Sequence, residues 1–185
     1  MGRKLKFFTF LLGTFFLGVF IGVIIAKMNP SAAEYLFKFL REVFGEGRLP
    51  SGFSLFLLIF LNNTRVAIIM AFGGLVFGIL PPLILLFNGA VVGIVGYHVS
   101  SMGEPLRKVI LAIVPHGILE VPALVIAGVG GMNWFAELVL GEGDFSERFK
   151  RGFKEMLKLL FVAILLLFVA ALVEAFITPK IAGIG

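Results

Sequence analysis

The sequence predicts an all-α, polytopic membrane protein that forms a single integral membrane domain over residues 1–185. Of its 185 residues, 59% are hydrophobic and only 15% are charged, and the mean hydropathy is +1.08. A soluble domain of this size cannot bury so much apolar surface. The apolar runs are continuous and approach the roughly 20 residues that a helix needs to cross a bilayer, whereas barrel strands alternate apolar and polar residues. We therefore expect about five transmembrane helices and two interfacial amphipathic helices.

The first crossing is expected over residues 7–26, an uncharged run that follows Arg3, Lys4 and Lys6. A basic start and an apolar body are also typical of a secretory signal peptide, but such a body usually has about 7–15 residues. We therefore predict a retained helix. Its Gly18 and Gly22 have the spacing that lets two membrane helices approach closely.

An amphipathic interfacial helix is expected over residues 31–44. Ser31 and Glu34 have the spacing of a capping box, in which the side chain of each residue accepts a hydrogen bond from the backbone N–H of the other. The apolar side chains that follow fall on one face, which suits a helix lying in the membrane interface. This helix either packs over the bundle or forms a partner-binding surface. Its apolar residues are Leu36, Phe37, Leu40, Val43 and Phe44.

The second and third crossings are expected between residues 53 and 97, where Arg65 is the only formally charged residue. A helix over residues 53–80 would be long for one crossing, so either it is tilted or it is broken near Asn62 and Asn63. Pro81 and Pro82 predict the turn before a third crossing over residues 83–97. The pairs of glycines in this region fit a homodimer contact or packing within one bundle; they are Gly74 with Gly78 and Gly89 with Gly93.

The fourth crossing is expected over residues 109–130, with Pro115 and Pro122 kinking or interrupting the helix. A second amphipathic helix, rich in basic residues, is expected over residues 144–158. Asp144 and Glu147 again have capping-box spacing. This helix leads into a fifth crossing over residues 159–177.

The net charge of +5 does not indicate nucleic-acid binding, because most lysines and arginines lie at the ends of apolar runs. Such charges suit anionic headgroups and the positive-inside bias. We expect a multi-pass protein of the cell membrane whose first partner is the lipid bilayer. The density of basic residues places the amino terminus and the basic helix in the cytoplasm.

Polar side chains within the apolar runs are the candidate site. His116 and Glu120 are one helical turn apart, and Glu174 lies in the last apolar run. Three interpretations remain open: a structural polar cluster, a divalent metal site, and a proton or ion pathway. His116, Glu120 and Glu174 have donor types that suit zinc. The structural cluster would contain these residues together with Asn62, Asn63, Asn88 and Thr178.

The order of several motifs resembles the stage II sporulation protein M family of integral membrane proteins. In spore-forming bacteria, the resemblance implies a membrane component of the septal machinery that acts with separate peptidoglycan-degrading enzymes. Many members occur in organisms that form no spores, and the resemblance brings no catalytic assignment. The motifs are Leu61-Asn62-Asn63, Gly73-Gly74 with Gly78, Asn88-Gly89 with Gly93, Pro115-His116-Gly117 with Glu120, Ala127-Gly128 with Gly130-Gly131, and Glu174-Ala175-Phe176-Ile177-Thr178-Pro179.

Together these features predict a membrane scaffold or assembly factor of the cell envelope rather than an enzyme. The two interfacial helices are the expected docking surfaces for envelope proteins. The alternative is a metal-dependent intramembrane enzyme or a small-solute or ion transporter that uses His116, Glu120 and Glu174. An enzyme would need water at the metal, and a transporter would need a cavity that opens to both sides in turn.

Overall fold

The computed structural model describes residues 2–45, 51–103 and 106–178; the side chains of residues 40–45 and 106–117 lie outside the described set. The described residues form helices and no strand, and five of the helices are long and apolar enough to cross a membrane. The all-α fold class and the number of crossings are thus confirmed. The helices are α1 (Arg3–Met28), α2 (Pro30–Gly45), α3 (Phe53–Gly73), α4 (Leu80–Ser101), α5 (Leu106–Leu140) and α6 (Phe145–Phe176).

Helix α5 is the central helix of the bundle. In the most apolar 18-residue window of its stretch Ile118–Leu140, 61% of the residues are buried, against 22–33% in the corresponding windows of the other four candidate spans. Helix α5 contains the whole predicted crossing over residues 109–130 and continues beyond it to Leu140. The helix also continues through Pro115 and Pro122 without interruption.

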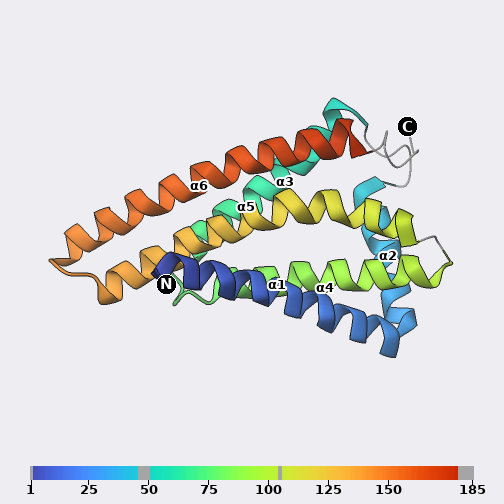
Figure 1. Cartoon of the computed structure of the whole chain (residues 1–185), viewed down its shortest axis with the longest axis horizontal. Helices are drawn as coiled ribbons and strands as arrows, with labels where there is room; N and C mark the ends of the chain where they lie inside the picture. The colour runs from blue at the N-terminus through green and yellow to red at the C-terminus, as the bar shows by residue number, and fades with distance from the viewer. Residues whose placement is uncertain (1, 46–50, 104–105, 179–185) are drawn as a thin grey trace.

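Helix α2 runs across the other helices at one end of the bundle (Figure 1), as expected for a helix in the membrane interface. Its start differs from the prediction, because Asn29 Oδ1 accepts a hydrogen bond from the Ala32 backbone N–H at 3.1 Å. Pro30 is the first helical residue, where the missing N–H costs nothing. The predicted box between Ser31 and Glu34 is therefore wrong.

The apolar face of α2 meets the bundle only in part of the predicted set. Leu36 and Phe37 are half-buried, and the Phe37 ring lies 4.9 Å from that of His98 in α4. Leu40, Val43 and Phe44 lie outside the described side chains. On the polar face, a 2.7 Å ion pair and hydrogen bonding with Lys38 hold the pKa of Glu34 below its ordinary value.

Helix α3 is continuous, so the predicted break near Asn62 and Asn63 is wrong. The chain instead turns over residues 74–79, where Phe77 and Gly78 have φ values of 51° and 69°. Pro81 and Pro82 lie in the first turn of α4 and not in the connection. Two successive residues in the left-handed backbone conformation, a phenylalanine and then a glycine, reverse the chain within a few residues.

Helices α1 and α4 pack through their glycines. A Cβ atom on Gly18 or Gly22 would overlap the α4 backbone at Leu86 or Ala90, and one on Gly89 or Gly93 would overlap the α1 backbone. These two glycine pairs are therefore used within one bundle. They give no support to the predicted homodimer, which stays a prediction.

Candidate functional site

Glu120 is the most buried ionisable side chain among the described residues, with 1% of its surface exposed. It lies on the central helix α5, on the side of the bundle core. Burying a carboxylate at this depth costs free energy unless its charge is neutralised or matched. Glu120 is thus the strongest functional candidate that the sequence predicted.

Asn63 of α3 lies at a similar depth to Glu120. Gly74 of α3 packs against Gly131 of α5. Asn63 precedes Gly74 by eleven residues, and Glu120 precedes Gly131 by eleven residues, so each lies about 16 Å along its helix from this contact. Asn63 is also buried. The structure therefore brings two of the predicted polar residues to one level of the core.

Glu174 lies at a different depth, in the last turn of α6. Helices α5 and α6 are antiparallel, with Gly130 beside Met156. At 1.5 Å per residue, Glu120 lies about 15 Å from this contact and Glu174 about 27 Å, in the same direction. The backbone of His116 lies between these two depths.

The predicted zinc site therefore depends on His116, whose side chain lies outside the described residues. Among the described side chains, no three His, Cys, Asp or Glu residues gather into a possible metal site. Metal binding by His116, Glu120 and Glu174 stays a prediction.

The other predicted polar residues have local roles. Asn88 Nδ2 donates to the Ile84 carbonyl at 2.8 Å, and Thr178 Oγ1 donates to the Val173 carbonyl at 3.3 Å. Both bonds stay within or beside one helix. Asn62 is exposed on the outside of α3. Within the described residues, Asn62, Asn88 and Thr178 therefore make no hydrogen bond that joins them to the predicted polar cluster between helices.

A second polar site joins three helices at the end of the bundle where the chain begins. Arg3 of α1 donates to Asn133 Oδ1 at 3.0 Å and to Glu137 Oε2 at 2.6 Å, both on α5. Arg151 of α6 donates to Glu137 Oε1 at 2.6 Å. Both oxygens of Glu137, whose side chain is only 13% exposed, are therefore bound by guanidinium groups.

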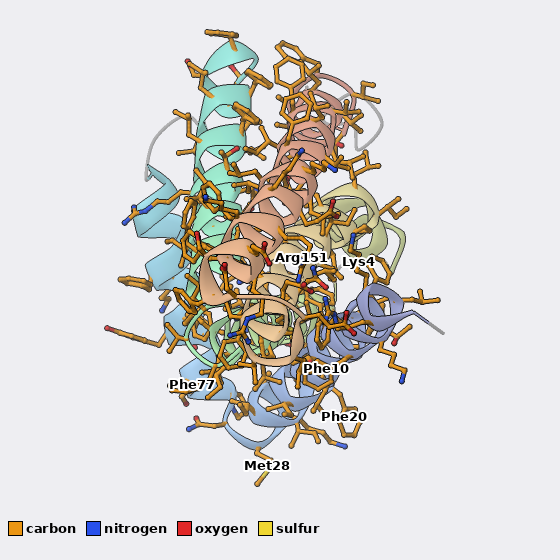
Figure 2. All side chains as sticks on the ribbon, turned by 90° about the vertical axis from the view of Figure 1, so that its left-hand side faces the viewer. Lys4, Phe10, Phe20, Met28, Phe77 and Arg151 are labelled. Carbon is orange, nitrogen blue, oxygen red and sulfur yellow. The ribbon has the colours of Figure 1, made fainter. Side chains whose placement is uncertain are left out.

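A neighbouring carboxylate repeats this arrangement. Glu155 of α6 accepts from Lys4 at 2.6 Å and from Lys158 at 3.0 Å. Figure 2 looks onto this end and shows Lys4 and Arg151 near the middle of the view, whereas Phe10 and Phe20 of α1 point outward. We call this set, Arg3, Lys4, Glu137, Arg151 and Glu155, the ion-paired end.

The loop between α5 and α6 is held at the same place. Asp144 Oδ1 accepts from the Glu147 N–H at 2.8 Å and Glu147 Oε2 accepts from the Asp144 N–H at 3.3 Å, which confirms the predicted capping box. Arg148 donates to the Leu138 carbonyl at 2.7 Å, and Arg151 donates to the Glu142 carbonyl at 2.7 Å. The basic half of α6 is thus fixed relative to α5.

Sequence reasoning missed the ion-paired end because its partners are far apart in the chain. Arg3 and Glu137 are separated by 134 residues. The available signal was local: Asn133 and Glu137 are four residues apart and share one face of α5. That pair indicated a polar patch on α5, but it did not indicate that α1 contacts this patch.

Two open grooves, each of about 260 Å³, lie on the outside of the bundle near this end. One lies between α1, α5 and α6 with Lys4 at its rim; the other lies beside Phe77 and Phe135. Apart from Lys4, their lining residues carry no charge, and neither lining includes Glu120, Glu174 or an asparagine. Both grooves suit apolar chains better than a polar substrate.

Comparison with known proteins accounts for nearly the whole chain. Residues 11–179 match the family described as Stage II sporulation protein M. This chain belongs to that family. No solved structure matches it.

Two relatives of this Stage II sporulation protein M family member come from Methanocaldococcus jannaschii. The uncharacterized protein MJ0793 is 37% identical over 123 residues, covering 65% of this chain and 69% of the relative. The uncharacterized protein MJ0706 is 33% identical over 136 residues, covering 69% of this chain and 58% of the relative. The comparisons thus place the chain in a family of membrane proteins.

Proposed function

We propose that this protein is a scaffold or assembly factor of membrane-bound envelope machinery. The observation that carries the proposal is the ion-paired end, which holds the basic half of α6 in one position. Lys150 and Lys154 are exposed there, and neither makes a hydrogen bond or ion pair within the described part of the chain. Because these two lysines have fixed positions but make no bond within the described bundle, they are better placed to bind a partner than to stabilise the fold.

The family description supports a place in envelope machinery, since sporulation in bacteria remodels the envelope at a septum. The buried core is consistent with the same role. Glu120 is closed off from the surface, and the two grooves described above are apolar. Neither groove offers the wet cavity that an intramembrane hydrolase would need.

The test is photo-crosslinking in native membranes from a reactive residue placed at Ser146, which is exposed at the start of α6. We expect crosslinks to envelope proteins that disappear in the double variant Lys150→Glu, Lys154→Glu. Arg148 and Arg151 are unsuitable for charge reversal, because both hold the α5–α6 loop. Identical crosslinks from the double variant, with its unfolding temperature unchanged, would count against the proposal.

Glu120 favours a second candidate function, a proton or ion pathway, because ionisable residues inside membranes commonly serve such paths. Proteoliposomes containing a pH-sensitive dye would test it, with Glu120→Gln as the isosteric control. Flux lost in that variant would favour transport over scaffolding.

The metal-dependent alternative is tested separately by elemental analysis of purified wild type, His116→Ala and Glu120→Ala. Near-stoichiometric metal that is lost in both folded variants would favour a metalloenzyme or a metal-handling protein. Metal-free protein from a metal-replete preparation would leave the scaffold proposal in place.

A further inference from the structure

Helix α3 carries an exposed stripe with the spacing of a helix-pairing seam. Its members recur at intervals of four, three, four and three residues, which is the repeat of helices that pack side by side over several turns. All are exposed, and the opposite face, with Asn63, Ala67 and Met70, packs into the bundle. We call this set the Arg65 stripe: Leu58, Asn62, Arg65, Ile69 and Phe72.

Arg65 lies near the middle of the membrane-spanning length of α3. It is twelve residues from Phe53 and eight from Gly73, about 18 Å and about 12 Å along the helix, in a hydrocarbon core about 30 Å thick. The turn beyond Gly73 is itself apolar, and Phe77 there is 75% exposed. The turn therefore extends the apolar part of the chain beyond Gly73.

The direction of the side chain also keeps Arg65 away from the nearer boundary. Cα–Cβ bonds in a helix tilt toward its amino terminus, which for α3 is the more distant end at Phe53. Snorkelling by the shorter route would run against this direction. A guanidinium group at this depth is costly unless a group of opposite charge meets it.

The described residues of the bundle supply no such group. Within the described residues, Arg65 makes no hydrogen bond or ion pair, and α3 contacts only α4, α5 and α6. The described residues of a second copy do not supply one either. Among the described carboxylates in the spans, Glu120 is closed in the core and Glu174 lies in the last turn of α6. Two such stripes face to face would also bring two Arg65 side chains together.

We propose that the Arg65 stripe docks a transmembrane helix of another protein that carries a carboxylate near the bilayer centre. The guanidinium group of Arg65 would bind both carboxylate oxygens, and Asn62, one turn away, would add an interhelical hydrogen bond. Leu58, Ile69 and Phe72 would supply the apolar contact. The inference rests on the proposed scaffold role and gives the chemistry of one membrane partner.

The test uses the full chain in phosphatidylcholine vesicles with a synthetic transmembrane helix of leucine and alanine that has one central Glu, or Gln in its place. The chain has no cysteine, so Ser54→Cys beside the stripe accepts a single donor dye. Energy transfer to acceptors on both ends of the peptide measures association. We expect the Glu peptide to bind about tenfold more tightly than the Gln peptide, and Arg65→Gln to remove the difference.

Matched controls locate the contact and protect against misfolding. A donor at Met28→Cys, at the same end of the bundle but on α1, should report weaker transfer than one at Ser54→Cys. Asn62→Leu should weaken binding of the Glu peptide only partly. The unfolding temperature of each variant establishes that the bundle is intact.

Three results would overturn the inference. The first is equal binding of the Glu and Gln peptides to the wild type. The second is transfer between labelled copies without peptide that depends on Arg65, which would assign the stripe to a second copy of the chain. The third is loss of peptide discrimination when phosphatidylglycerol is added, which would assign Arg65 to an anionic lipid. Unchanged crosslinking from Ser146 in the Arg65→Gln variant would leave the scaffold proposal standing in each case.

Discussion

At the residue scale, the charges of this protein follow two different rules. Glu137 is largely buried and bound by two guanidinium groups, so its charge is matched inside the molecule. Arg65 is exposed near the middle of a span and has no described partner. Exposed ion pairs contribute little to stability, but removing one partner of a buried pair is expensive. We therefore expect the matched residue to stabilise the bundle, and the unmatched one is the residue that we propose binds a partner.

Replacing Glu137 with Gln should lower the free energy of unfolding by about 1–3 kcal/mol, because two charge-assisted hydrogen bonds lose their acceptor charge. Thermal unfolding in detergent would measure the change. Glu142→Gln is the matched control, since its side chain is exposed and only its backbone carbonyl accepts from Arg151. An equal effect of the two substitutions would contradict the role given to Glu137.

At the element scale, helices pack here mainly by close approach of their backbones. The four glycines between α1 and α4 let the two helices touch without intervening side chains. Such contact is an important source of helix association in lipid, where the hydrophobic effect contributes little. The same sequence pattern therefore predicts packing well and partners poorly.

Gly22→Leu should strongly destabilise the bundle, by about 3 kcal/mol or more, because its side chain would overlap the backbone of Ala90. Gly13→Leu on the same helix is the control, since a Cβ there meets nothing within 4 Å. Chemical denaturation in mild detergent would compare them. Similar losses of stability in both variants would mean that the α1–α4 contact is not as close as described.

The turn between α3 and α4 should also depend on a single glycine. Gly78 has φ of 69°, so Gly78→Ala should cost about 1–2 kcal/mol through backbone strain. Gly2→Ala, where the added Cβ meets nothing, should leave unfolding unchanged. A Gly78→Ala variant as stable as the wild type would show that the turn relaxes to another conformation.

At the scale of the whole molecule, the two ends of the bundle differ. One end carries the ion-paired residues, the capping box and the basic half of α6; α2 crosses the other end (Figure 1). From the positive-inside bias we expect the basic end to face the cytoplasm. The bundle thus has one highly charged end, and the amphipathic helix α2 lies at the other end.

The orientation predicts which cysteines a membrane-impermeant maleimide reaches in intact cells. Met28→Cys and Ser54→Cys should react from outside, and Ser146→Cys should react only after the membrane is opened. The natural absence of cysteine leaves no background. The opposite labelling pattern would show that the protein has the reverse orientation in the membrane, with the same fold.

Composition, the length of the apolar runs and residue spacing determined the helical class, the number of crossings and the capping box at Asp144, and hydrophobic periodicity predicted the amphipathic α2. These features depend on local composition, bilayer thickness and contacts three or four residues apart. Even so, the predicted fourth crossing stopped at residue 130, whereas α5 continues to Leu140. The turn at Phe77 was missed, because glycines that permit a turn look the same in a sequence as glycines that permit packing.

Only the tertiary structure decided which polar groups meet. It paired Arg3 with Glu137 across 134 residues, placed Asn63 near the depth of Glu120, and left Arg65 exposed on α3. Pairing between distant segments depends on the order and depth at which helices pack, and no local pattern encodes that. The sequence by itself therefore determined a five-span helical membrane protein, whereas the packing of its helices decided which of its charges stabilise the fold and which remain free to bind.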